Sequence, residues 1–217
     1  MKDESMHTVD SFHLVDDGAT LEAIAAHSGF IFAVGLALTI LWLIHGWPHA
    51  PLSWAWAAIA LAIGLISLAV LPLHELFHAL AFKLLGAGDA TLHFGYLSPG
   101  MLYTSCEGAV FSRQRYIAIL LTPAVCITAL LMTAGIWLGY PLAAFICAYL
   151  HLMGCTGDFA MARYLLKAQA PYVRDTSYGI DLVEPARESL PATPESGAPQ
   201  PAAPKSALPT VTGADAL

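Results

Sequence analysis

Two histidines and a glutamate stand inside an otherwise apolar segment, "LPLHELFHALAFKLLG", at residues 71–86. His74 and His78 are four residues apart, so on a helix their imidazoles lie on one face and can bind one ion. Glu75 then stands beside them, within reach of water on that ion. This H-E-x-x-H spacing is typical of zinc sites in which two histidines bind the metal and the glutamate is the general base. The alternative is an interfacial cluster satisfied by water and neighbouring helices.

A catalytic zinc needs a third protein ligand and keeps one position open. Asp158 is the best candidate, because it is an isolated acid at the end of a second long apolar stretch. At 1.5 Å per helical residue, His74 lies about 30 Å along its span from Trp54, and Asp158 lies about 24 Å along its span from Leu142. Both spans run in the same direction, so the two groups should meet at one level. The sequence therefore predicts one Zn²⁺ per chain, bound by His74, His78 and Asp158.

Two further residues near Asp158 could take part in this site. In a continuous helix, His151 lies about two turns before Asp158, on the same face but roughly 10 Å deeper. It is either a substitute ligand, a hydrogen-bonding partner of a ligand, or a core histidine. Cys155 has a zinc-binding side chain, but on a continuous helix it points at a different angle. His45 and His49 repeat the four-residue spacing across Gly46 and Pro48, which predicts a loop.

These residues must be positioned by membrane-spanning helices. The chain of 217 residues is 57% hydrophobic and only 12% charged, whereas soluble domains have about 25% charged residues. No Asp, Glu, Lys or Arg occurs between Glu22 and Glu75 or between Arg115 and Asp158. Turn-forming residues divide each stretch, so we expect four spans near 29–44, 54–85, 116–138 and 142–166. The fold class is thus an all-α membrane protein of about four transmembrane helices.

The remaining segments are loops and tails. The stretch "ATLHFGYLSPGMLYTS" alternates apolar and polar residues around a Ser-Pro-Gly turn, which predicts a small β-hairpin in the central loop. The C-terminal residues are rich in Pro, Ala, Ser and Thr, so we expect a disordered tail.

The basic residues indicate the orientation of the chain. They all lie outside the two short loops, 45–51 and 139–141, that join the first span to the second and the third to the fourth. By the positive-inside rule both termini should be cytoplasmic. With a net charge of -7, the sequence does not show the excess of basic residues that is typical of proteins that bind nucleic acid.

The segments "HELFHALAFKLLG", "RQRYIAILLTP" and "GCTGDFAMARYLL" together resemble the putative zincin peptidases, small membrane proteins of the domain-of-unknown-function class. The chain is more distantly similar to the site-2 protease superfamily of intramembrane metalloproteases. The resemblance covers roughly residues 54–167. It implies His74, His78 and Asp158 as zinc ligands and Glu75 as the catalytic base. Composition and charge divide the chain into three parts: an acidic cytoplasmic segment at 1–28, a multi-pass metallopeptidase-like domain at 29–170, and a Pro/Ala-rich tail at 171–217.

We therefore expect a zinc-dependent metalloendopeptidase of the cell membrane that acts on membrane or membrane-proximal proteins. Its partners should be membrane lipid and a protein or peptide substrate; the sequence leaves open whether copies associate as a homo-oligomer. The competing functions are a non-catalytic metal-binding protein, such as an ion carrier or sensor, and a scaffold that works through its tail. The central hairpin either holds the substrate in extended form or only covers the site. His93 and Glu107, in the same loop, have no assigned role.

Overall fold

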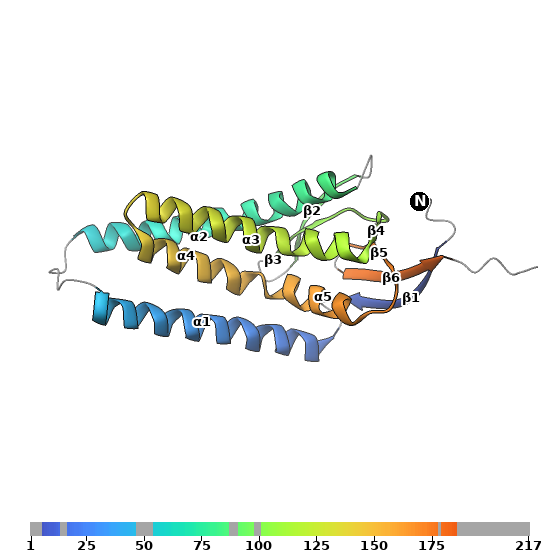
Figure 1. Ribbon diagram of the computed structural model, residues 1–217, viewed down its shortest axis with the longest axis horizontal. Helices are drawn as coiled ribbons and strands as arrows, with labels where there is room; N and C mark the ends of the chain where they lie inside the picture. The colour runs from blue at the N-terminus through green and yellow to red at the C-terminus, as the bar shows by residue number, and fades with distance from the viewer. Residues whose placement is uncertain are drawn as a thin grey trace, which may run out of the picture. The chain divides into compact units, whose positions relative to one another are not determined.

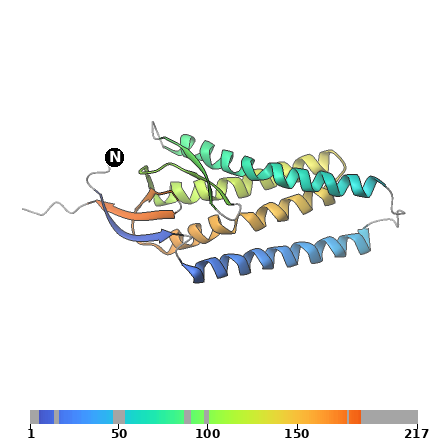
Figure 2. The same cartoon turned by 180° about the vertical axis from the view of Figure 1, so that it is seen from behind.

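The computed structural model describes residues 6–13, 17–46, 54–86, 91–97, 101–177 and 179–185. Its five helices are α1 (Gly18–Gly46), α2 (Trp54–Leu85), α3 (Arg113–Trp137), α4 (Pro141–Gly154) and α5 (Thr156–Lys167). The first three are long and apolar enough to cross a membrane, and α4 with α5 makes a fourth if that bent pair is one span. The prediction of a mostly helical protein is confirmed, and the predicted four membrane spans are compatible with the length and composition of these helices. Figures 1 and 2 show these helices running side by side.

The outer faces of the long helices are apolar. Phe30 on α1 is 68% exposed, and Trp54 and Leu68 on α2 are 92% and 65% exposed. Soluble proteins rarely expose contiguous apolar patches beyond a few hundred Å². These faces therefore suit contact with lipid.

Helix α1 begins at Gly18, before the position 29 that the sequence analysis predicts for the first span. The start is explained by Asp17, whose carboxylate accepts the Ala19 amide at 3.1 Å and the Thr20 hydroxyl at 2.5 Å. Such a cap satisfies donors that the first helical turn leaves free. The Thr20 hydroxyl bond, followed by the Ala19 bond, holds the pKa of exposed Asp17 below its ordinary value.

A four-stranded antiparallel sheet lies at one end of the helices (Figure 1). Its strands, in the order β1-β6-β5-β4, are Met6–His13, Gly179–Pro185, Tyr172–Asp175 and Val110–Ser112. No sequence pattern predicts this sheet, since the predicted all-α class includes only the hairpin of the central loop as β structure. Three of its strands come from the segments 1–28 and 171–217, which the predicted division of the chain places outside the membrane domain. Residues beyond 185 lie outside the described part of the chain, so the disorder of that tail stays a prediction.

The β-hairpin expected in the central loop is present. Strand β2 (His93–Leu97) pairs antiparallel with β3 (Met101–Ser105). The predicted Ser-Pro-Gly turn between them lies outside the described residues. The hydroxyl of Thr104 on β3 donates to the carbonyl oxygen of Glu75 on α2 at 3.1 Å. The hairpin is therefore attached to the helix that carries the H-E-x-x-H motif.

A buried carboxylate joins the sheet to the helices. Asp175 on β5 is 3% exposed, and it accepts the Tyr116 hydroxyl of α3 and, at 2.5 Å, the Cys106 amide. Burial outweighs these bonds and raises the pKa of Asp175 to about 6. Around this contact a core forms from α3, α5 and the sheet, including Ile119, Leu165 and Val173.

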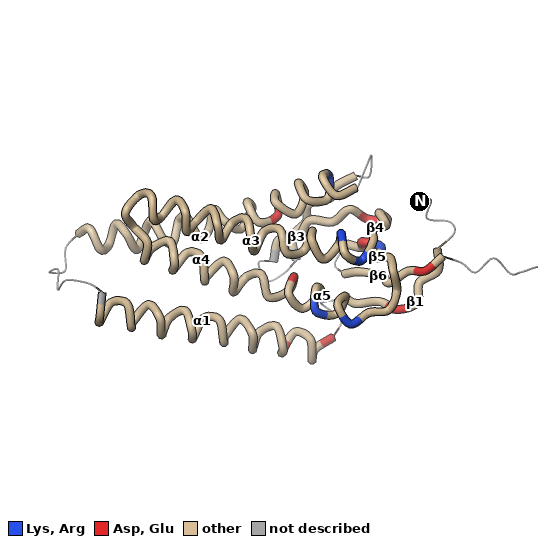
Figure 3. The backbone as a smooth tube through the Cα atoms, viewed as in Figure 1, with Lys and Arg blue, Asp and Glu red and all other residues tan. Residues whose placement is uncertain are grey.

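Charged residues gather at the sheet end of the described chain, and the helices away from that end carry almost none (Figure 3). The described basic residues are Lys83, Arg113, Arg115, Arg163, Lys167 and Arg174. This distribution is the one from which the sequence analysis predicts cytoplasmic termini; the orientation itself stays a prediction.

Candidate metal centre

Helix α2 places His74 and His78 on one face, as their spacing predicts. Their rings lie 4.7 Å apart between centroids, and the two Nε2 atoms are separated by 3.1 Å. His78 is 7% exposed. Both nitrogens therefore point toward the same small region.

Asp158 reaches that region from α5. Its Oδ2 lies 3.2 Å from Nε2 of His74, and its Oδ1 lies 3.4 Å from Nε2 of His78. The structure thus brings together the three residues that the sequence analysis proposes as ligands, although they are about eighty residues apart in the chain. Their assignment as ligands stays a prediction, which the chemistry below supports.

The helix that carries Asp158 is broken, which corrects the predicted continuous span 142–166. Helices α4 and α5 meet at Cys155 with a bend of 53°. The Cys155 amide donates to the carbonyls of both His151 and Leu152, as at the end of a helix. A new helix starts at Thr156, so Asp158 stands in its first turn. A helix N-terminus stabilises negative charge, which favours an ionised carboxylate there.

The break also moves His151 and Cys155 into the site. On a continuous helix His151 would lie about 10 Å deeper than Asp158, but its Nε2 is 3.2 Å from Nδ1 of His74. Cys155 Sγ lies 3.8 Å from that same Nδ1 and 3.5 Å from Nε2 of His151. The expectation that these two residues lie deeper or at another angle is wrong, because it assumed a straight helix. The flanking Gly154 and Gly157 were the available signal of a break.

A proline on α3 fixes the orientation of His78. In an α-helix the carbonyl of residue 119 accepts the amide of residue 123, but that residue is Pro123, which has no N–H. The free carbonyl of Ile119 lies 3.2 Å from Nδ1 of His78. A carbonyl only accepts hydrogen bonds, so Nδ1 carries the hydrogen and Nε2 of the neutral ring is bare. Sequence reasoning missed this role, although "LLTP" contains its signal.

The donor set fits a zinc ion. Tetrahedral zinc with bonds of about 2.0–2.1 Å separates its ligand atoms by about 3.3 Å. Here the two Nε2 atoms are 3.1 Å apart, and each faces a different oxygen of the Asp158 carboxylate, at 3.2 Å for His74 and 3.4 Å for His78. Two imidazoles and a carboxylate are also among the usual zinc ligands. Without a cation, the bare Nε2 of His78 would face only a carboxylate and another imidazole nitrogen. An ion satisfies all three groups at once.

Glu75 offers a basic oxygen beside this cluster. Its Oε2 is buried and has no hydrogen-bond partner among the described residues. Its backbone carbonyl is occupied by Thr104, as described above. Burying a polar atom without a partner costs free energy, and such atoms often mark a site of chemistry. The carboxylate is therefore available to a water or substrate group.

The other histidines and acids noted in the sequence lie elsewhere. His45 was expected in a loop, but it stands in the last turn of α1, where its ring bonds to the carbonyl of Leu41. This expectation is corrected for His45, and His49 lies outside the described residues. His93 on β2 and Glu107 after β3 are exposed.

Comparison with known proteins gives one finding. Residues 67–173 match the model of a family whose description is "putative zincin peptidase". The matched segment contains the H-E-x-x-H motif, the hairpin, α3 and Asp158, and the resemblance predicted from the sequence is confirmed. No curated protein and no solved structure matches the chain.

Proposed function

We propose that this chain, whose residues 67–173 match the putative zincin peptidase family, is a zinc-dependent, membrane-embedded metallopeptidase. It hydrolyses peptide bonds of membrane or membrane-proximal proteins. The observation that supports this proposal best is the convergence of His74, His78 and Asp158, whose facing atoms lie 3.1–3.4 Å apart. Glu75 directly follows His74 on α2 and has a buried carboxylate oxygen without a hydrogen-bond partner among the described residues. The expected cofactor is one Zn²⁺ per chain.

Each residue has a distinct part in the proposed reaction. A zinc ion held by these residues would polarise a substrate carbonyl and lower the pKa of a water toward about 7. His74, His78 and Asp158 hold the ion, and the Ile119 carbonyl keeps Nε2 of His78 bare for it. Oε2 of Glu75 takes the proton of the attacking water and returns it to the leaving amine. General acid-base catalysis of this kind contributes about 10²–10⁴ in rate.

The central hairpin supplies a way to hold the substrate. A helix within a bilayer has its backbone fully hydrogen-bonded, so its peptide bond must first be extended. A β-strand can bind an extended peptide along its edge. The β2-β3 hairpin is attached at Glu75 through Thr104, and Phe94 and Tyr96 on β2 are 61% and 66% exposed. We assign the hairpin this role in substrate binding.

The helices and the charges support a membrane location. The proposed location is the cell membrane, which the chain crosses several times, with lipid around α1, α2 and α3 and both termini in the cytoplasm. Because the charged residues gather at the sheet end, the proposed cleavage takes place near the cytoplasmic face.

A metal carrier or sensor is the main alternative. Such a protein needs ligands but has no need of Glu75 with a free carboxylate oxygen next to them. A scaffold that works through its C-terminal tail needs neither. The peptidase proposal accounts for the ligands and for Glu75 together.

The deciding experiment compares the wild type with Glu75→Gln in lipid vesicles, using a fluorescence-quenched single-span peptide as the probe. We expect zinc-dependent cleavage by the wild type, loss of at least about a hundredfold in turnover for the variant, and unchanged zinc content in both. Glu22→Gln, at an exposed position of α1, is the matched control and should retain activity. Hydrolysis by Glu75→Gln at the wild-type rate would overturn the assignment.

A further inference from the structure

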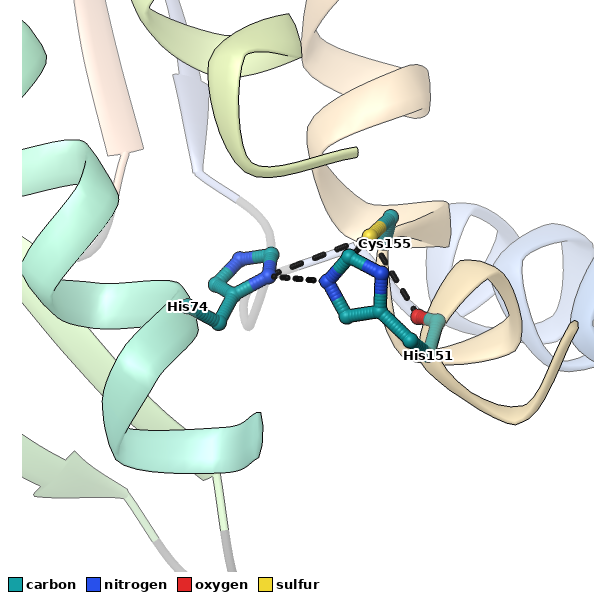
Figure 4. Close-up of side chains that lie close together, drawn as sticks. All are labelled: His74, His151 and Cys155. Atoms are coloured by element: carbon teal, nitrogen blue, oxygen red, sulfur yellow. Dashed lines mark hydrogen bonds between the residues drawn. The ribbon is translucent and has the colours of Figure 1, made fainter. Parts of the chain in front are cut away.

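A second group of metal-binding side chains lies directly beside the first and shares one residue with it. Nδ1 of His74, Nε2 of His151 and Sγ of Cys155 lie within 4.8 Å of one another. Figure 4 shows the two imidazoles and the thiol pointing toward one another from α2 and from the break between α4 and α5. Cys155 is fully buried and His151 is 7% exposed.

The spacing of this second group fits a metal ion. Zinc bonds are about 2.0–2.1 Å to nitrogen and about 2.3 Å to sulfur, so tetrahedral ligands lie about 3.3 Å apart for two nitrogens and about 3.6 Å apart for nitrogen and sulfur. The distances are 3.2 Å between the two nitrogens and 3.5 and 3.8 Å from them to Sγ. Two imidazoles and a thiolate are a borderline-to-soft donor set of the kind that zinc, cobalt and cadmium accept.

We propose that His74, His151 and Cys155 form a second position for a zinc-like divalent cation, occupied in alternation with the position at His74, His78 and Asp158. The two positions exclude each other because they use opposite nitrogens of one ring. A neutral imidazole has one bare nitrogen and one N–H. His74 therefore binds through Nε2 in the first position or through Nδ1 in the second.

The surrounding groups serve both tautomers of His74. When the ion lies on Nε2, the Nδ1 hydrogen points at Nε2 of His151, 3.2 Å away. When the ion lies on Nδ1, the Nε2 hydrogen points at Oδ2 of Asp158, also 3.2 Å away. In each case the unused nitrogen donates to an acceptor that is already in place. Moving the ion thus costs no hydrogen bond on His74.

The thiol and His151 can both become ligands without a change of fold. Sγ of Cys155 lies 3.3 Å from the carbonyl of His151, to which the thiol donates in the absence of metal. On binding, the thiol proton is released to solvent and the thiolate contacts the ion. Nδ1 of His151 has no hydrogen-bond partner among the described residues. Nothing there fixes the tautomer, so Nε2 is free to present its lone pair.

The second position requires no hydrolysis by the protein, and only the alternation rests on the first metal centre. An ion in the second position has lost His78 and Asp158. It is then held as a reserve, away from the ligand set that we propose for catalysis.

The test uses the purified full chain loaded with Co²⁺, because a thiolate-cobalt bond gives a near-ultraviolet charge-transfer band. We expect one cobalt per chain and a charge-transfer band in the wild type. Cys155→Ser should abolish the band and keep one cobalt, now in the first position, which also shows that the variant is folded. Asp158→Asn should strengthen the band by weakening the first position. Cys147→Ser, at a buried cysteine of α4, is the control and should keep the band.

Three results would overturn the proposal. The wild type could bind cobalt without a thiolate band, or Cys155→Ser could keep the band unchanged. Two cobalt ions per chain would refute the alternation. This experiment and the peptidase assay can fail independently. The charge-transfer band is measured without turnover, and turnover does not require a thiolate ligand.

Discussion

The imidazole of His78 is held by the carbonyl of Ile119, with 3.2 Å between Nδ1 and the oxygen. That carbonyl is free because the residue four positions later on α3 is Pro123, which cannot donate the usual helical bond. A helix-breaking residue in one span thus determines the tautomer of a proposed ligand on another. Partners of this kind typically change metal affinity 10- to 100-fold when they are removed.

Replacing Pro123 by Ala should weaken metal binding while leaving the helix more regular. The new amide competes with His78 for the Ile119 carbonyl, so we expect zinc affinity to fall about tenfold. The affinity is measured by competition with a chromophoric chelator. Thr122→Ala is the matched control, because its hydroxyl bonds only to the Ala118 carbonyl and is exposed. Unchanged affinity in Pro123→Ala would show that the Ile119 contact does not orient the ligand.

Removing a ligand of the first position should remove the ion once the second position is also disabled. In a Cys155→Ser background, His78→Ala and Asp158→Ala each leave two of the three donors of the first position, and we expect zinc content well below one per chain after dialysis. The measurement is metal analysis of the purified proteins. His45→Ala, which removes a histidine on α1 whose ring bonds to the Leu41 carbonyl of the same helix, should keep the zinc content of its parent. Full zinc content in Asp158→Ala combined with Cys155→Ser would show that Asp158 is not a ligand of the ion.

The local part of this site could be read from the sequence, and the tertiary part only in outline. His74 and His78 share a face because a four-residue spacing on a helix is a local property. The meeting with Asp158 followed from counting residues along two spans. The places of His151 and Cys155 did not follow, because they depend on a 53° break that only Gly154 and Gly157 signalled.

The four-stranded sheet could not be predicted from the sequence for a different reason. Strand β1 pairs with β6, so that Met6 lies opposite Pro185 at the other end of the described chain. No periodicity within either segment identifies such a distant partner, and both segments stand next to stretches rich in polar residues or proline. The H-E-x-x-H motif, by contrast, carries its chemistry in its own spacing.

The buried carboxylate of Asp175 should make stability depend on pH. Its pKa in the folded protein is about 6, mainly because of burial, against an ordinary value of 3.8. The native state therefore holds more protons than the unfolded state between these values, so stability should fall as pH rises from about 4 to 6, by roughly 3 kcal/mol. The groups that face this carboxyl are Tyr116, Cys106, Glu107 and His78.

The measurement is the thermal midpoint of the detergent-solubilised protein across this pH range, for the wild type and Asp175→Asn. The variant lacks the titrating group, so the difference between the two proteins should change with pH in the stated direction. Parallel curves would show that Asp175 does not titrate in this range.

The proposed substrate role of the hairpin predicts an effect on KM with little effect on kcat. Phe94 and Tyr96 are exposed on β2, so truncating both to Ala leaves the core intact. If a bound peptide covers them, the double variant loses apolar contact and KM should rise about tenfold, which corresponds to about 1.4 kcal/mol. Trp137→Ala, an 84% exposed aromatic at the end of α3, is the control and should leave KM unchanged. Because zinc content should stay the same in both variants, an unaltered KM in the Phe94 and Tyr96 variant would mean that the hairpin only covers the site.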